Sequence, residues 1–148
     1  MDSVFATVIS GTCVFIFGQL VLKLLIEPVH QLKRTLADIS HTFVVHADLL
    51  CNIDVISTEQ KDELRSRLRT LCGQIHSDMA LIPCYSIVRW IFFLPQKDNL
   101  YAGAQNLIGI GNHLYAKNAS WFEHITKLID TAHTNLRLYQ RPQDRLSD

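Results

Sequence analysis

Apolar residues fill the first part of the chain almost without interruption. Positions 3–26, between Asp2 and Glu27, carry only two strongly polar side chains, Gln19 and Lys23. A helix needs about 20 mostly apolar residues to cross a bilayer core of ~30 Å. A cleaved secretory signal would instead start with basic residues and end at small ones, and a buried helix of a soluble protein is normally shorter. The pattern therefore predicts a transmembrane helix over 3–26, with the lipid bilayer as its first partner.

The basic residues near this run predict its orientation. Lys23, Lys33 and Arg34 lie at and after its C-terminal end, and no Lys or Arg precedes it. By the positive-inside rule we expect the N-terminus outside and the body in the cytosol, as in a single-pass protein of the inner (cytoplasmic) membrane. These three residues then mark the membrane interface, where Lys23 extends its ammonium group to the headgroups.

Two residues inside the run are candidates for contacts between membrane helices. Gly11 belongs to a small-xxx-small pair, a spacing that allows two helices to approach closely. Gln19 has either an interhelical hydrogen bond or a side chain that reaches toward the headgroups. Self-association into a homo-oligomer is therefore one prediction for this segment.

Beyond Glu27 the apolar residues recur at intervals of three and four, which is the period of a helix with one buried face. Pro28 suits the start of a new helix or a kink in a continuing one, so we expect the chain to change direction there. The fold class is all-α: a transmembrane helix, then an antiparallel bundle of about four to five helices over 27–139, then a polar, disordered tail over 140–148. The predicted buried stripes are Val29, Leu32, Leu36, Ile39, Phe43, Ala47 and Leu50; Leu64, Leu68, Leu71, Ile75 and Met79; Leu100, Ala104, Leu107, Ile108 and Leu114; and Trp121, Ile125, Leu128, Ala132 and Leu136.

Polar residues at fixed offsets predict where helices begin. Ser57 with Gln60 and Ser120 with Glu123 have the spacing of capping boxes. Asp98 is a further candidate cap. The glycines at 103, 109 and 111 indicate either a neighbouring helix packed closely on that face or a kinked turn near 109–111.

The segment from Cys84 to Leu94 is apolar nearly all round, lies between two prolines and is too short to cross a bilayer. It is either the most buried helix of the bundle or an anchor in the headgroup zone, with Arg89 and Trp90 at the interface. The lack of a clean polar face favours the buried position.

Composition and motifs give no indication of a catalytic, metal-binding or nucleic-acid-binding function. The net charge is zero, so no global field favours nucleic acid as a partner. The four cysteines include no C-x-x-C pair, which indicates free thiols in a reducing compartment. Histidines stand one turn from carboxylates, but a metal site also needs ligands from facing helices. We therefore predict no metal, cofactor or catalytic residues. The unsupported pairs are Glu27 with His30, Asp38 with His41, and Cys51, Cys72 or Cys84 with His46 or His76.

One basic edge is a candidate surface for an unknown protein partner. Lys61, Arg65 and Arg69 recur every four residues on one predicted helix. They form either a partner-binding edge or a solvated face, since Asp62 and Glu63 stand beside them and weaken the field.

Three stretches of the chain carry a resemblance: the join GQLVLKLLIEPVHQLKRTLADISHTFVVHADLL, and then IPCYSIVRWIFFLP and LIGIGNHLY. Through them the chain resembles an uncharacterised family of small bacterial proteins that have one N-terminal transmembrane helix and a helical cytosolic body. The resemblance implies a bacterial membrane protein and no particular activity or ligand. Our first functional hypothesis is a membrane-anchored interaction or scaffold protein without catalytic activity. The alternative is a membrane-acting effector or toxin that perturbs the bilayer through Cys84 to Leu94.

Overall fold

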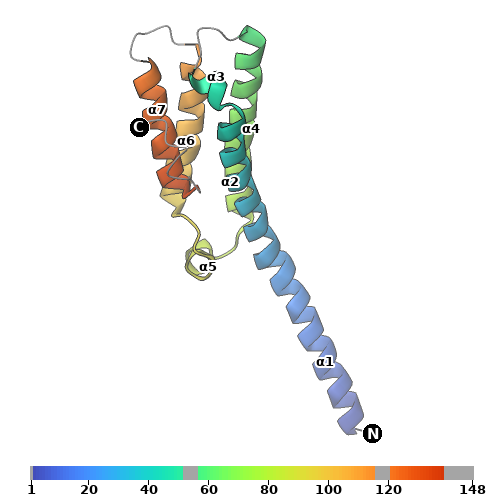
Figure 1. Ribbon diagram of the computed structural model, residues 1–148. Helices are drawn as coiled ribbons and strands as arrows, with labels where there is room; N and C mark the ends of the chain where they lie inside the picture. Colours follow the sequence, from blue (N-terminus) through green and yellow to red (C-terminus); the bar gives the residue numbers. More distant parts are fainter. Residues whose placement is uncertain (1, 52–56, 116–120, 139–148) are drawn as a thin grey trace.

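One long helix dominates the chain. The structure, a computed structural model, describes residues 2–51, 57–115 and 121–138, and these are helical apart from short turns. The first elements are α1 (Asp2–Val21), η1 (Leu22–Ile26) and α2 (Glu27–Val45). They follow one another without a break and form a rod that extends well beyond the rest of the molecule (Figure 1). The predicted all-α class is confirmed.

The chain does not turn sharply at Pro28, so the expected change of direction is wrong. Just before Pro28, the backbone N–H of Glu27 bonds to the carbonyl of Leu22, five residues back, and η1 is a π-helical turn. Proline lacks an N–H and its ring crowds the carbonyl four residues earlier, which here belongs to Leu24. The wider π turn makes room for the ring. The second alternative, a continuing helix, therefore describes this join.

The remaining helices form an antiparallel bundle with α2. They are α3 (Ala47–Cys51), α4 (Thr58–Leu81), α5 (Tyr85–Phe92), α6 (Lys97–His113) and α7 (Trp121–Leu136). Helix α4 packs on α2, α6 on α4 and α7 on α6, with alternating directions (Figure 1). The predicted stripes supply most of the core, which confirms the helical period. The buried members are Val29, Leu32, Leu36, Ile39, Phe43, Leu50, Leu64, Leu68, Leu71, Ile75, Met79, Leu100, Ala104, Leu107, Leu114, Ile125, Ala132 and Leu136.

The errors in the stripes are small. Ile108 is exposed and Leu128 is half-buried, while Ile110 and Ile129 occupy the core beside them. These two errors are shifts of one or two positions on the helix surface. Such a shift follows when the packing angle of a neighbouring helix selects a slightly different face. Ala47 is also half-buried, and the side chain of Trp121 is not among those that the structure describes.

Of the predicted helix starts, the one at Ser57 is confirmed and the one at Asp98 is wrong. The capping box at Ser57 is present: its hydroxyl accepts from the Gln60 N–H at 3.3 Å, and the Gln60 amide oxygen accepts from the Ser57 N–H at 3.3 Å. Asp98 is not a cap, because α6 already begins at Lys97; the carboxylate lies inside the first turn, where it favours the helix dipole. The box at Ser120 and the tail over 140–148 lie outside the described residues.

Close packing explains one glycine of α6, Gly103. A Cβ there would lie 2.5 Å from Cγ of Leu136 in α7, whereas one on Gly111 would lie 3.4 Å from Cγ of Arg65 in α4, an ordinary van der Waals distance. Helix α6 runs through 109–111 without interruption. The close-approach interpretation is therefore confirmed at Gly103, and the kinked turn is wrong.

Candidate functional site

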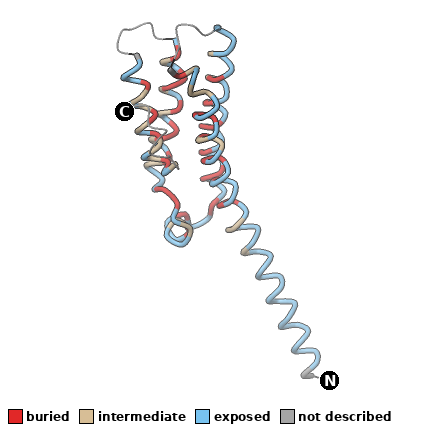
Figure 2. The backbone as a smooth tube through the Cα atoms, in the orientation of Figure 1, coloured by how far each residue is buried: buried red, intermediate tan, exposed pale blue. Residues whose placement is uncertain are grey.

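The apolar α1 continues into η1 and extends away from the bundle (Figure 1). All its described side chains from Val4 to Leu20 are exposed, and none of its most apolar window is buried (Figure 2). By length and composition it belongs to one helix able to cross a membrane, Val4–Val45. N-terminal helices of this kind occur both as membrane anchors and as signal sequences. The exposure of the apolar window excludes α1 as a core helix of the described bundle.

The predicted interface residues do not form one cluster. Lys23 is exposed in η1, whereas Lys33 and Arg34 are exposed on α2, beside the bundle. At 1.5 Å per residue, Lys33 lies about 15 Å further along the helix axis than Lys23. Gln19 and Gly11 both lie on the exposed surface of α1, and a Cβ at Gly11 would meet open space.

Helix α5 is exposed on one side, so the prediction that it is the most buried helix is wrong. Tyr85 and Val88 face the core and are 4% and 3% exposed. The opposite side carries Ile87, Trp90, Ile91 and Phe93, which are 63%, 82%, 55% and 82% exposed, and we call these four residues the outward face. The apolar sequence alone does not show how many sides of the helix other elements will cover. In the fold, α5 lies at the end of the bundle, and the described elements cover only one of its sides (Figure 1).

Both ends of α5 are held firmly. Cys84 and Phe93, which flank the helix, have φ values of 47° and 56°, a left-handed backbone that persists only where the surroundings impose it. The Tyr85 hydroxyl donates to the Pro95 carbonyl at 2.9 Å, and the Lys97 ammonium lies 5.3 Å from the centroid of the Tyr85 ring. Burial, opposed weakly by Arg89, raises the pKa of Tyr85 to about 12. The outward face is thus a fixed surface.

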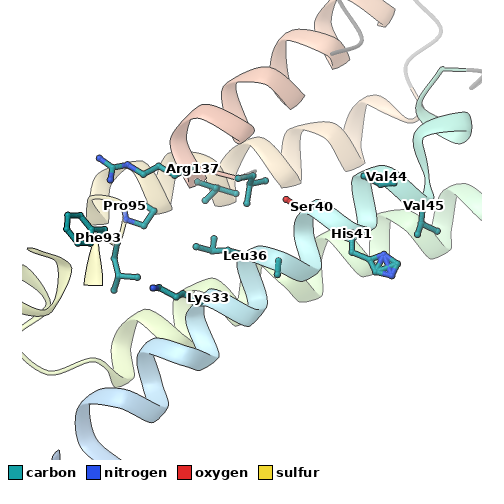
Figure 3. A pocket seen from close by; sticks show the side chains of 13 residues that line it. Lys33, Leu36, Ser40, His41, Val44, Val45, Phe93, Pro95 and Arg137 are labelled. Atoms are coloured by element: carbon teal, nitrogen blue, oxygen red, sulfur yellow. The ribbon is translucent and has the colours of Figure 1, made fainter. Parts of the chain in front are cut away.

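A groove of about 800 Å³ opens between α2, the α5–α6 connection and the end of α7 (Figure 3). Its cationic side chains are Lys33 and Arg137, His41 lies on the α2 wall, and none of the described residues that line it is a carboxylate. The rings of Phe43 and His133, 5.4 Å apart, also join α2 to α7. The other lining residues are Leu36, Ala37, Ser40, Val44, Val45, Phe93, Leu94, Pro95, Leu136 and Leu138.

A second, polar pocket of about 590 Å³ lies on α2 and α4. Its innermost group is Asp78, which is 2% exposed and accepts a hydrogen bond of 2.5 Å from the Thr35 hydroxyl. This pair joins the two helices, and the local sequence gave no signal for it because the partners are 43 residues apart. Within the described ranges, no group of three or more His, Cys, Asp or Glu is arranged to hold a metal ion.

The Cys72 and His76 pair is not arranged for nucleophilic attack. His76 Nδ1 lies 2.8 Å from the Cys72 carbonyl oxygen and 3.9 Å from its Sγ. A carbonyl only accepts, so Nδ1 must carry the proton and cannot take one from the thiol. Burial also raises the pKa of the Cys72 thiol, which keeps it protonated.

The basic edge of α4 is partly used within the fold. Arg65 donates to Asn112 of α6 at 3.4 Å, and its guanidinium lies 5.4 Å from the centroid of the Tyr115 ring. The Tyr115 hydroxyl in turn donates to Asp62. Lys61 is half-buried and Arg69 is exposed. Binding of a partner by this edge stays a prediction, and Arg65 has a structural role in joining α4 to α6.

Comparison with known proteins identifies no family for this chain: no family model, no curated protein and no solved structure matches it.

Proposed function

We propose that this protein is a single-pass, membrane-anchored interaction protein whose helical body lies at the cytosolic face of a bacterial inner membrane. The observation that carries the proposal is the exposed, apolar surface of α1, which continues into the core helix α2. Exposing so large an apolar surface to water is costly, at roughly 25 cal/mol per Å². A bilayer removes that cost. The cations at Lys23, Lys33 and Arg34 support a cytosolic body.

The proposed action is binding, without catalysis or a cofactor. The arrangement of Cys72 and His76 supports this, because neither group is prepared to act as nucleophile or base. The exposed surface of α1 around Gly11 and Gln19 offers a contact for a second copy within the membrane. Partners in the cytosol would approach the bundle, at the groove or at Arg69 and Lys61.

We favour an anchor over a membrane-perturbing effector. An effector would need α5 to leave the bundle and enter the bilayer. That movement would remove Tyr85 and Val88 from the core cluster and expose to solvent the apolar bundle residues that they cover. Burying each such side chain stabilises by about 1.5–3 kcal/mol. The contacts therefore favour a docked α5.

Topology mapping tests the proposal. Reporter fusions at both termini should place the N-terminus outside and the C-terminus in the cytosol, and carbonate washing should leave the full chain in the membrane. Intact mass measurement separates an anchor from a cleaved signal, because an anchor retains residues 1–26. Loss of that segment, or release into the soluble fraction, would refute the proposal.

Self-association has its own test with a matched control. Gly11→Leu should weaken dimer crosslinking in membranes if this face packs against a second copy. Cys13→Leu is the control, since it also enlarges an exposed side chain of the same helix but lies on the opposite face, about 200° around the helix from Gly11. An equal effect of the two substitutions, or no effect of either, would remove Gly11 from a specific contact.

A further inference from the structure

We infer that the outward face of α5 is a second membrane contact, lying in the boundary between headgroups and acyl chains of the bilayer that α1 crosses. The inference rests on the proposed function, because only an anchored α1 brings a bilayer to this end of the molecule. It assigns to Ile87, Trp90, Ile91 and Phe93 a defined partner, the lipid surface.

The outward face has the geometry of an in-plane helix. Ile87, Trp90 and Ile91 are spaced three and four residues apart, so they form one stripe, and Phe93 extends it past the end of the helix. The opposite side is occupied by the bundle through Tyr85 and Val88. An interfacial helix usually turns a polar face away from the lipid. Here the protein itself covers that side, so no polar face is needed.

The position of α5 matches the position of the proposed membrane. It lies at the end of the bundle from which α1 departs, and its stripe remains exposed in the folded chain (Figures 1 and 2). Leu81, at the end of α4 just before α5, is also exposed and apolar. A bilayer around α1 therefore meets this end of the bundle first.

The chemistry of the segment fits headgroups better than a protein surface or water. Tryptophan concentrates at the membrane interface, where its ring contacts lipid and its N–H reaches a polar group. Arg89, half-buried beside Trp90, is the only charged residue between Cys84 and Leu94, and no carboxylate there repels anionic lipid. The ends of α5 are fixed by Tyr85 and by the left-handed Phe93, so the stripe is presented without further ordering.

Tryptophan fluorescence in membranes tests the inference. The chain has two tryptophans, so Trp121→Phe leaves Trp90 as the only reporter. The full-length variant is reconstituted into vesicles of phosphatidylglycerol and phosphatidylcholine that carry bromine at a shallow or a deep acyl position. We expect blue-shifted Trp90 emission that shallow bromine quenches more strongly than deep bromine. Unquenched emission would overturn the inference, and blue-shifted but unquenched emission would show that protein, rather than lipid, covers the face.

Two controls make the result specific. Ile108→Trp, in a chain with Trp90→Phe and Trp121→Phe, places the reporter at an exposed position in the far half of α6, where quenching should be absent. Ile87→Glu with Ile91→Glu should lose most of the Trp90 quenching while circular dichroism is unchanged, because both side chains are exposed. If this double substitution leaves the quenching unchanged, the stripe does not contact lipid.

The failure of this inference is distinguishable from failure of the anchor. Each sample is also floated on a density gradient and washed with carbonate. A chain that leaves the vesicles refutes the proposed anchor. A chain that stays with the vesicles while Trp90 remains unquenched overturns the α5 contact alone.

Discussion

Replacing Gly103 with alanine tests the close approach of α6 to α7. The added Cβ would lie 2.5 Å from Cγ of Leu136 and would also clash with its Cδ2. Leu136 is fully buried, so relieving the clash requires its side chain to move within the core or toward the groove that it lines. Gly73, in the exposed middle of α4, provides the matched control because a Cβ there meets open space.

The two substitutions should have opposite signs. Overpacking a core costs about 1–3 kcal/mol. Alanine regains about 1 kcal/mol over glycine inside a helix. For Gly103→Ala we therefore expect a net destabilisation of up to about 2 kcal/mol, because the overpacking outweighs the gain in helix propensity. Gly73→Ala meets no such clash and should stabilise the protein by about 0.5–1 kcal/mol.

Urea unfolding in mild detergent, followed by far-ultraviolet circular dichroism, measures both free energies. The denaturant dependence of the two variants should match that of the parent, so that midpoints report stability. If Gly103→Ala stabilises the protein as much as Gly73→Ala does, α6 and α7 are not in close contact at Gly103. A Leu136→Ala substitution combined with Gly103→Ala should relieve the clash, which would appear as non-additivity.

Three further substitutions test other contacts. Thr35→Val leaves buried Asp78 without its hydroxyl donor and should destabilise by about 1.5–3 kcal/mol in urea unfolding, whereas an unchanged midpoint would contradict a buried contact. Burial raises the pKa of Tyr85, so the stabilisation that its neutral hydroxyl gives the folded state is complete below pH 10 and is lost as the pH rises through about 12. Tyr85→Phe should therefore flatten the alkaline fall in melting temperature. Burial, opposed by the Asp130 charge, lowers the pKa of His133, so the stabilisation that its neutral ring gives the folded state is present above about pH 6.5 and is lost on acidification. His133→Leu should reduce the loss of stability below that pH. An unchanged dependence of melting temperature on acidic pH would refute the burial of a neutral His133.

The helical stripes could be predicted because they depend on local period alone. A core position such as Leu68 or Leu107 needs only to recur every three or four residues to identify its face. The capping box at Ser57 was predictable for the same reason, since both partners lie within four residues. Local rules therefore gave most of the fold.

The features that sequence reasoning missed depend on which segments meet. The burial of Asp78 beside Thr35 follows from the packing of α2 on α4, and neither residue belongs to a recognisable motif. The exposure of one side of α5 follows from its place at the end of the bundle. Arg65 was predicted at a partner-binding edge, but its contacts with Asn112 and Tyr115 were not foreseeable.

The continuity of α1 with α2 has a mechanical consequence for a membrane-anchored body. Tilting α1 must either pull α2 from α4 or bend the rod at η1. Separation would expose Val29, Leu32 and Leu36 at about 1.5–3 kcal/mol each. Bending at η1 disturbs only a π turn and the start of α2, where Pro28 already supplies no N–H. We therefore expect η1 to absorb differences in tilt, so that the bundle and α5 keep their contacts while the anchor adapts to the thickness of the bilayer.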